Sequence, residues 1–155
     1  MRKHKLQMAV SGSILMAVLL AGCGQPVTGL SVNEGWVRAL PPGKTITAGF
    51  AELHNPTASD CAIVAISSPQ AERVELHSSA MDEGVMRMRP MESPTIAAGS
   101  SLLLAPGGNH FMLFGLGEHA AHLERVELLL STSCGDISAE LPVRRSAAGG
   151  DHSHH

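Results

Sequence analysis

The sequence predicts an all-β domain, either a β-sandwich or a small barrel, from three observations. Short apolar runs alternate with turns that contain Gly and Pro along most of the chain. Apolar and polar residues alternate with period two in Val74-Glu75-Leu76-His77, as expected of a half-buried strand. Only residues 117–122 favour a helical turn, and there is no internal repeat. We therefore expect one domain built of strands and turns.

Turn signals separate the expected strands. Val32, Trp36 and Val37 supply the apolar side chains of the first, and Pro41-Pro42-Gly43 ends it. Gly84 can take the positive φ that a hairpin turn at 81–85 requires. The expected strands lie within residues 31–40, 45–53, 61–67, 74–77, 85–89, 101–104, 109–114, 123–131 and 136–143.

The first 22 residues resemble a bacterial lipoprotein signal peptide. Basic residues precede a mainly apolar stretch, 8–20, which is shorter than the roughly 20 apolar residues of a transmembrane helix. Leu20-Ala21-Gly22-Cys23 resembles a lipobox, which implies cleavage before Cys23 and its lipidation. Acyl chains there would anchor the protein on the periplasmic or cell-surface side of a membrane. A plain secretory signal with an incidental cysteine is the alternative.

The expected organisation follows from these segments. It consists of a signal peptide at 1–22, a lipidated tether at 23–30, the β-domain at 31–144 and a disordered, His-containing tail at 145–155.

The charge balance excludes some functions. Signal cleavage removes three basic and no acidic residues, which lowers the formal charge from −3 to −6. An acidic surface of this kind repels nucleic acid. The sequence also lacks a nucleophile elbow and a phosphate-binding glycine loop, so we do not expect an enzyme.

The cysteines divide by role. If Cys23 is lipidated, Cys61 and Cys134 are left as a pair in an exported, oxidising compartment. Paired cysteines there favour a disulfide. Two thiolate ligands for copper are the competing interpretation.

Four soft donors indicate a metal site: His77, Met88, His110 and Met112. Thioethers and neutral imidazoles together favour copper(I), whereas zinc sites use Cys, His and carboxylates. On a strand, His110 and Met112 share one face and form a preorganised pair. We expect His77 at the end of its strand, from where its side chain could swing toward the hairpin.

Further donors are weaker candidates. Met86 shares a strand face with Met88 but could be an ordinary core filler. His119 and His122 could chelate a metal if that segment is helical, although solvated side chains are the simpler interpretation. The tail histidines, His152, His154 and His155, could bind copper(II) loosely, unless they are solvated or the remnant of a tag.

The spacing of the four donors resembles the H-x10-M-x21-H-x-M signature of the periplasmic PCu(A)C copper chaperones. The flanking text is similar as well, in Trp36-Val37-Arg38-Ala39, Val85-Met86-Arg87-Met88-Arg89-Pro90 and Leu104-Ala105-Pro106-Gly107-Gly108. The resemblance implies a cupredoxin-like β-barrel that binds one copper(I) near its surface. It also implies delivery to the copper A site of cytochrome c oxidase, with Sco-type proteins as partners. Cys61, Cys134 and the segment 119–122 depart from the usual pattern.

Two other functions compete with copper transfer. An electron-transfer cupredoxin would need a Cys ligand close to His and Met, and Cys134 has neither within the following residues. A structural lipoprotein would carry its Met and His incidentally. Loss of copper on dialysis would support that last interpretation.

Overall fold

The computed structural model describes residues 29–117 and 122–145, and the fold is all-β, as predicted. The strands are β1 (Ser31–Arg38), β2 (Thr47–His54), β3 (Cys61–Ser67), β4 (Arg73–Asp82), β5 (Val85–Pro90), β6 (Thr95–Ile96), β7 (Ser101–Leu104), β8 (His110–Phe114), β9 (Arg125–Thr132) and β10 (Ile137–Arg144). Within the described part of the chain, no helix is long and apolar enough to cross a membrane.

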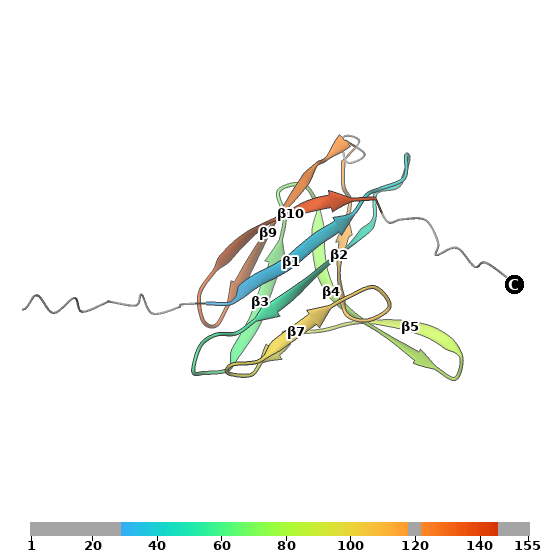
Figure 1. The fold of residues 1–155 in the computed structure, drawn as a ribbon. Coiled ribbons are helices and arrows are strands. Elements are labelled where there is room, and N and C mark those ends of the chain that lie inside the picture. The colour runs from blue at the N-terminus through green and yellow to red at the C-terminus, as the bar shows by residue number, and fades with distance from the viewer. Residues whose placement is uncertain (1–28, 118–121, 146–155) are drawn as a thin grey trace, which may run out of the picture.

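The strands form one open sheet that folds over its own core (Figure 1). Their order is β5-β4-β8-β2-β1-β10-β9-β3-β6, and β7 pairs with β2 beside β8. Every pair is antiparallel except β1 with β10, where Val37 faces Val143. This arrangement is cupredoxin-like, and the expected fold class is confirmed.

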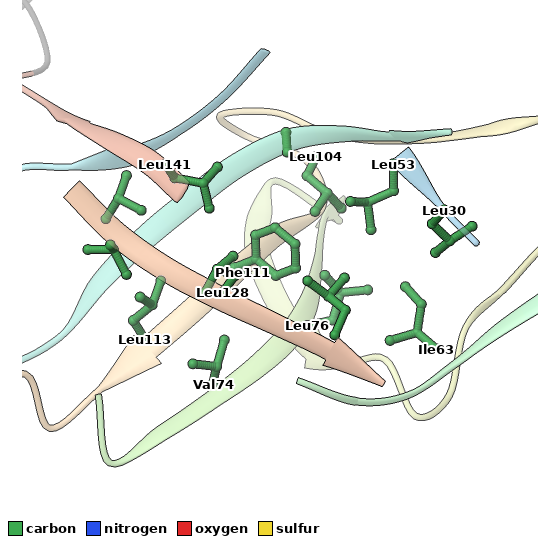
Figure 2. Packing of buried hydrophobic residues seen from close by; sticks show 14 of the residues in the cluster. Leu30, Leu53, Ile63, Val74, Leu76, Leu104, Phe111, Leu113, Leu128 and Leu141 are labelled. Atoms are coloured by element: carbon green, nitrogen blue, oxygen red, sulfur yellow. The ribbon is translucent and has the colours of Figure 1, made fainter. Parts of the chain in front are cut away.

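Alternation along the strands builds the core. In β4, Val74 and Leu76 point inward, while in β9 Val126, Leu128 and Leu130 do so. Side chains of β4 and β8 meet those of β9 across the interior, although these strands are not hydrogen-bonded to β9 (Figure 2). Phe111 of β8 is fully buried among them. The opposite face of β4 and β8 is therefore left for the site.

The hairpin between β4 and β5 is tighter and longer than the sequence indicated. Its turn consists of Glu83 and Gly84 alone, with φ of 49° and 81°, the backbone of a two-residue hairpin loop. Because β4 runs on to Asp82, His77 lies in the middle of the strand. Our expectation that His77 ends its strand was wrong. Pairing with β5, rather than burial in the core, extends the strand beyond it.

Asn55 stabilises the end of the domain where β2 leads into the following loop. Its buried amide donates to the carbonyl oxygens of Ser59, Ile96 and Ala97, at 2.8, 2.9 and 3.2 Å. Its carbonyl accepts from the backbone N–H and the hydroxyl of Thr57. One side chain thus satisfies polar groups of two loops.

We expect Asn55→Ala to lower the free energy of unfolding by roughly 2–3 kcal/mol, because it leaves buried carbonyl groups without donors. Urea unfolding followed by circular dichroism measures the change. The matched control is Asn33→Ala, which removes an exposed amide with one long hydrogen bond and should change stability little. A loss below about 1 kcal/mol for Asn55→Ala would contradict this account.

Candidate metal site

Strand register brings the predicted donors to one outer face of the sheet. β4 lies between β5 and β8, and His77 pairs directly with His110 on β8. On the other side of β4, Ser79 pairs with Met88 of β5. Glu75 pairs with Met112 of β8, the strand that also carries His110. Because paired residues and those two positions apart share a face, all four donors lie on the same side of the sheet.

The donors form a buried floor and an exposed rim. His110 is 7% exposed, and the side chain of His77 is 13% exposed. Met112 is half-buried beside them, whereas Met88 on the hairpin is 55% exposed. The imidazoles are therefore fixed by packing, and a thioether remains in contact with solvent.

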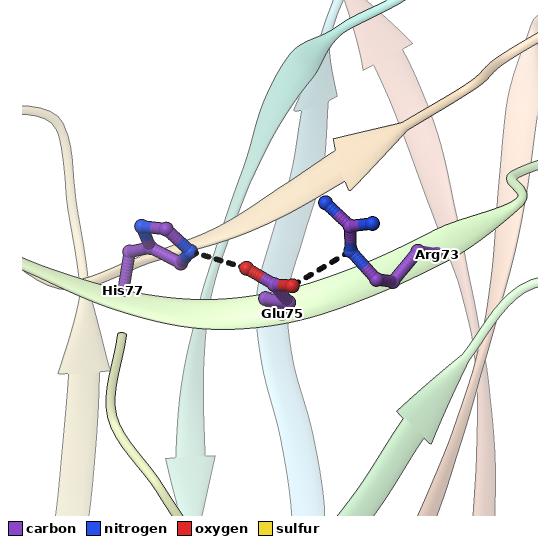
Figure 3. Close-up of polar contacts among 3 residues, drawn as sticks. All are labelled: Arg73, Glu75 and His77. Carbon is purple, nitrogen blue, oxygen red and sulfur yellow. Dashed lines mark hydrogen bonds and ion pairs between the residues drawn. The ribbon is translucent and has the colours of Figure 1, made fainter. Parts of the chain in front are cut away.

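Glu75 and Arg73 hold the His77 ring in place (Figure 3). Nε2 of His77 lies 2.8 Å from Oε2 of Glu75, whose Oε1 accepts from Arg73 Nε at 2.6 Å. The hydrogen bond from His77, and then the charge of Arg73, lower the pKa of the Glu75 carboxyl from its ordinary value. As an ionised acceptor, Glu75 favours the tautomer of His77 that carries its proton on Nε2.

The other nitrogen of His77 is the clearest sign of a ligand. Nδ1 is buried and has no hydrogen-bond partner among the described residues, although buried polar atoms are normally paired. With the proton on Nε2, Nδ1 presents a lone pair. This is what a metal-binding imidazole requires, with a carboxylate on the opposite nitrogen.

His110 is oriented in the complementary way. Its Nδ1 lies 3.0 Å from the carbonyl oxygen of Gly108, so a proton on Nδ1 leaves Nε2 as the lone-pair nitrogen. The rings of His77 and His110 have centroids 5.9 Å apart. With metal–nitrogen bonds of roughly 2 Å, two rings that share an ion have centres roughly 5–6 Å apart.

The types of donor side chain restrict which metal ion the site could bind. Among residues 29–117 and 122–145, no three His, Cys, Asp or Glu side chains are grouped so that they could hold a metal ion. A site built on the two histidines could be completed by thioethers on the same face, those of Met88 and Met112. This chemistry favours a soft ion.

A hollow of about 380 Å³ opens beside the donors. Met88, His110 and Met112 line it together with Phe50, whose ring centroid is 6.5 Å from that of His110. Arg38 also lines the hollow, with its guanidinium 5.5 Å from the Phe50 centroid. Three of the four donors thus border a space that is open to the surface, and His77 is not among them.

The remaining candidate residues lie elsewhere or outside the described chain. Met86 borders the same hollow as Met88, whereas His122 borders a separate one with Arg145. Cys61 and Cys134 form a disulfide between β3 and the turn after β9, so their sulfur atoms bind each other. Outside the described residues lie Cys23, His119, His152, His154 and His155.

Sequence reasoning missed the residues that orient the histidines. Glu75, two residues before His77, contributed to the prediction only through the period-two alternation of residues 74–77. Its spacing of two residues did place the carboxylate and the imidazole on one face. The Gly108 carbonyl is only two residues from His110, but its acceptor role depends on the backbone of the turn before β8, which leaves no side-chain signal. The Phe50 ring reaches His110 only through the tertiary fold.

Comparisons with known proteins agree with this architecture. A family model described as "Putative lipoprotein LpqE-like" matches residues 30–143. A protein of Leifsonia xyli subsp. xyli named "Putative lipoprotein Lxx21020" is 32% identical over 123 residues, which cover 78% of this chain and 73% of that protein.

Solved structures of copper-binding domains have a similar fold. A copper-bound PCuAC domain from PmoF2 has a TM-score of 0.64 at 17% identity, and 77% of this chain and 97% of that domain are covered. The solution structure of CuI-DR1885 from Deinococcus radiodurans has a TM-score of 0.55 at 28% identity, with 82% and 85% covered. The structural likeness is thus to the PCuAC domains that the sequence resembles, and by its family model and relative the chain belongs to the LpqE-like family.

Proposed function

We propose that this protein is an extracytoplasmic copper(I) chaperone. It binds one ion through His77, Met88, His110 and Met112 and transfers it to a partner. The observation that carries the proposal is the buried, unpartnered Nδ1 of His77, whose ring lies 5.9 Å from that of His110. Similarity to the copper(I)-bound DR1885 structure supports the choice of metal.

Copper(I) suits these donors better than copper(II) or zinc. Thioethers are soft, uncharged and need no deprotonation, and they bind hard ions poorly. Two neutral imidazoles complete the shell without adding negative charge. Because Glu75 and the Gly108 carbonyl fix the two tautomers, little reorganisation is needed when the ion binds.

Transfer fits the distribution of exposure. His77 and His110 lie at the floor, whereas Met88 is more than half exposed at the rim. Incoming ligands of a partner can displace Met88 first, while the histidines still hold the ion. Copper then moves by ligand exchange, and its oxidation state does not change.

The destination and the anchor are part of the same proposal. The resemblance to PCu(A)C chaperones supports the copper A site of cytochrome c oxidase as the acceptor and Sco-type proteins as co-workers. The family description and the relative's name support a lipoprotein, so we propose that Cys23 carries the lipid anchor. The tail histidines, outside the described residues, would supply weaker copper(II) binding.

An electron-transfer role is less well supported. A blue-copper site requires a cysteine thiolate, and Cys61 and Cys134 are joined in a disulfide on the β3 and β9 side of the sheet. Intense blue colour in the copper(II) protein would favour electron transfer instead.

Copper K-edge absorption on the protein loaded with one equivalent of copper(I) tests the proposed shell. We expect sulfur scattering at about 2.3 Å together with imidazole nitrogen at about 2.0 Å, distances typical of such ligands. A spectrum with nitrogen and oxygen scatterers alone would reject the mixed shell. Loading under ascorbate, without thiols, preserves the disulfide during the measurement.

Glu75→Gln tests the orienting role of the carboxylate. The amide can accept a hydrogen bond from His77 but no longer carries the charge that fixes the tautomer, so we expect copper(I) affinity to fall roughly 10-fold. Competition with a copper(I) chelator measures the change. The control, Glu127→Gln, alters a carboxylate on β9 that accepts from Ser138. Equal affinities for wild type and Glu75→Gln would argue against this role.

A further inference from the structure

The β4–β5 hairpin has three methionines, of which the proposed copper site uses only Met88. It extends beyond the body of the sheet, and all six residues of β5 are exposed (Figure 1). Met81, Met86 and Met88 are 66%, 48% and 55% exposed. Among the described residues, every large, exposed methionine side chain lies on this hairpin. Exposed apolar side chains gathered in one place usually mark an interaction site.

Register places the three thioethers in sequence along one face. Met81 pairs directly with Met86, and Ser79 pairs with Met88. The next pair toward the body of the domain is His77 with Pro90, followed across β8 by His110. The row therefore runs from the hairpin tip to the proposed copper site. Met86 and Met88 border the hollow beside His110, whereas Met81 borders a different hollow with Arg87 and Arg89.

Strand register places the three methionines at neighbouring positions of the hairpin. Cβ atoms of a direct cross-strand pair such as Met81 and Met86 lie about 4.5–5.5 Å apart. Met88 follows Met86 by two residues, which is roughly 7 Å along a strand. Each methionine has three rotatable side-chain bonds, so the sulfur atoms can converge on one soft ion between them.

We propose that Met81, Met86 and Met88 form a second, weaker copper(I) site that loads the first. Copper(I) binds the three thioethers at the tip. His77, His110 and Met112 then replace Met81 and Met86, while Met88 remains bound to the ion throughout. Only dative bonds form and break, so no electron donor or acceptor is needed. The loading step rests on the proposed function, whereas binding at the tip does not.

Methyl NMR of methionine-labelled full-length protein tests the tip site directly. Copper(I), which is diamagnetic, is added anaerobically with ascorbate. We expect the first equivalent to shift the methyl signals of Met88 and Met112. Because Met88 is then held in the first site, further copper(I) binds the two remaining thioethers more weakly and shifts the signals of Met81 and Met86. Met91, half-buried against the core, is the internal reference and should not move. Signals of Met81 and Met86 that stay unmoved up to three equivalents would overturn the inference.

The double variant Met81→Leu/Met86→Leu tests loading. Leucine keeps the apolar surface of the hairpin. Any change in the loading rate is therefore due to loss of the thioether sulfur atoms and not to loss of an apolar docking surface. We expect the tight site to keep its affinity within twofold, and its rate of loading from a weak copper(I)–chelator complex to fall at least fivefold. Met91→Leu is the matched control. An unchanged loading rate would overturn the relay.

Failure of this inference can be distinguished from failure of the proposed function. A tight first site together with unmoved Met81 and Met86 signals would reject the tip site alone. Shifts of Met81 and Met86 without a tight site would support the tip site and reject the chaperone proposal. In His110→Ala, we expect the tip signals to shift with the first equivalent of copper(I) instead of the second.

Discussion

Replacing His110 with alanine is expected to lower the copper(I) affinity of the protein more than 100-fold. Changes to groups that merely orient a metal ligand already lower affinity 10–100-fold, so loss of the ligand should exceed that range. His110 shares the floor of the site with His77, and no described residue offers a third imidazole there. Anaerobic titration against a competing copper(I) chelator measures the change.

Two controls separate loss of the ligand from loss of the fold. His110 is buried, so alanine leaves a small cavity, and thermal unfolding of the apo variant must be compared with that of wild type. Met112→Leu conserves volume and should also lower affinity, because it removes a thioether without creating a cavity. Wild-type affinity in both variants would refute the ligand assignment.

Removal of the disulfide is expected to have the largest effect on stability. Cys61 and Cys134 are 73 residues apart, and a cross-link over such a loop stabilises a protein by about 4 kcal/mol in the chain-entropy model. Cys61 is fully buried, so the double variant Cys61→Ala/Cys134→Ala avoids placing a hydroxyl in the core. Urea unfolding of oxidised wild type and of the variant gives the difference.

The same variant separates structural from metal-binding roles of the cysteines. The disulfide links β3 to the turn after β9, on strands that carry none of the four proposed ligands. We therefore expect copper(I) affinity to stay within about twofold of wild type below the unfolding temperature. A stability change under 1 kcal/mol, or a marked loss of copper affinity, would contradict this division of roles.

The sequence predicts the strands well where one face is buried. Alternation in Val74-Glu75-Leu76-His77 identifies both the strand and its inner face, which the structure confirms. Residues 78–82 have no such pattern, because they are held by pairing with β5 rather than by burial. For that reason, the prediction that His77 ends its strand was wrong. β6, two residues long, is too short to leave a periodic signal.

The sequence identifies the candidate donor residues but not the groups that orient their side chains. The spacing and softness of the four donors drew attention to them, and register places them on one face. Their role as ligands stays a prediction. The hydrogen bond of His110 to the Gly108 carbonyl depends on the local turn backbone, whereas its contact with Phe50 depends on how β2 and β8 pack. Such contacts between distant segments cannot be read from a single sequence.

Exposure of Met88 at the rim has a chemical consequence in an oxidising compartment. Solvent-accessible methionine is converted to its sulfoxide, which replaces a soft sulfur donor with a hard, polar S=O group. The imidazoles of His77 and His110, which are largely shielded from solvent, would not be oxidised under the same conditions. If the proposed ligands bind copper, an oxidised protein would keep its nitrogen donors and lose affinity for the cuprous state, and reduction of the sulfoxide would restore that affinity.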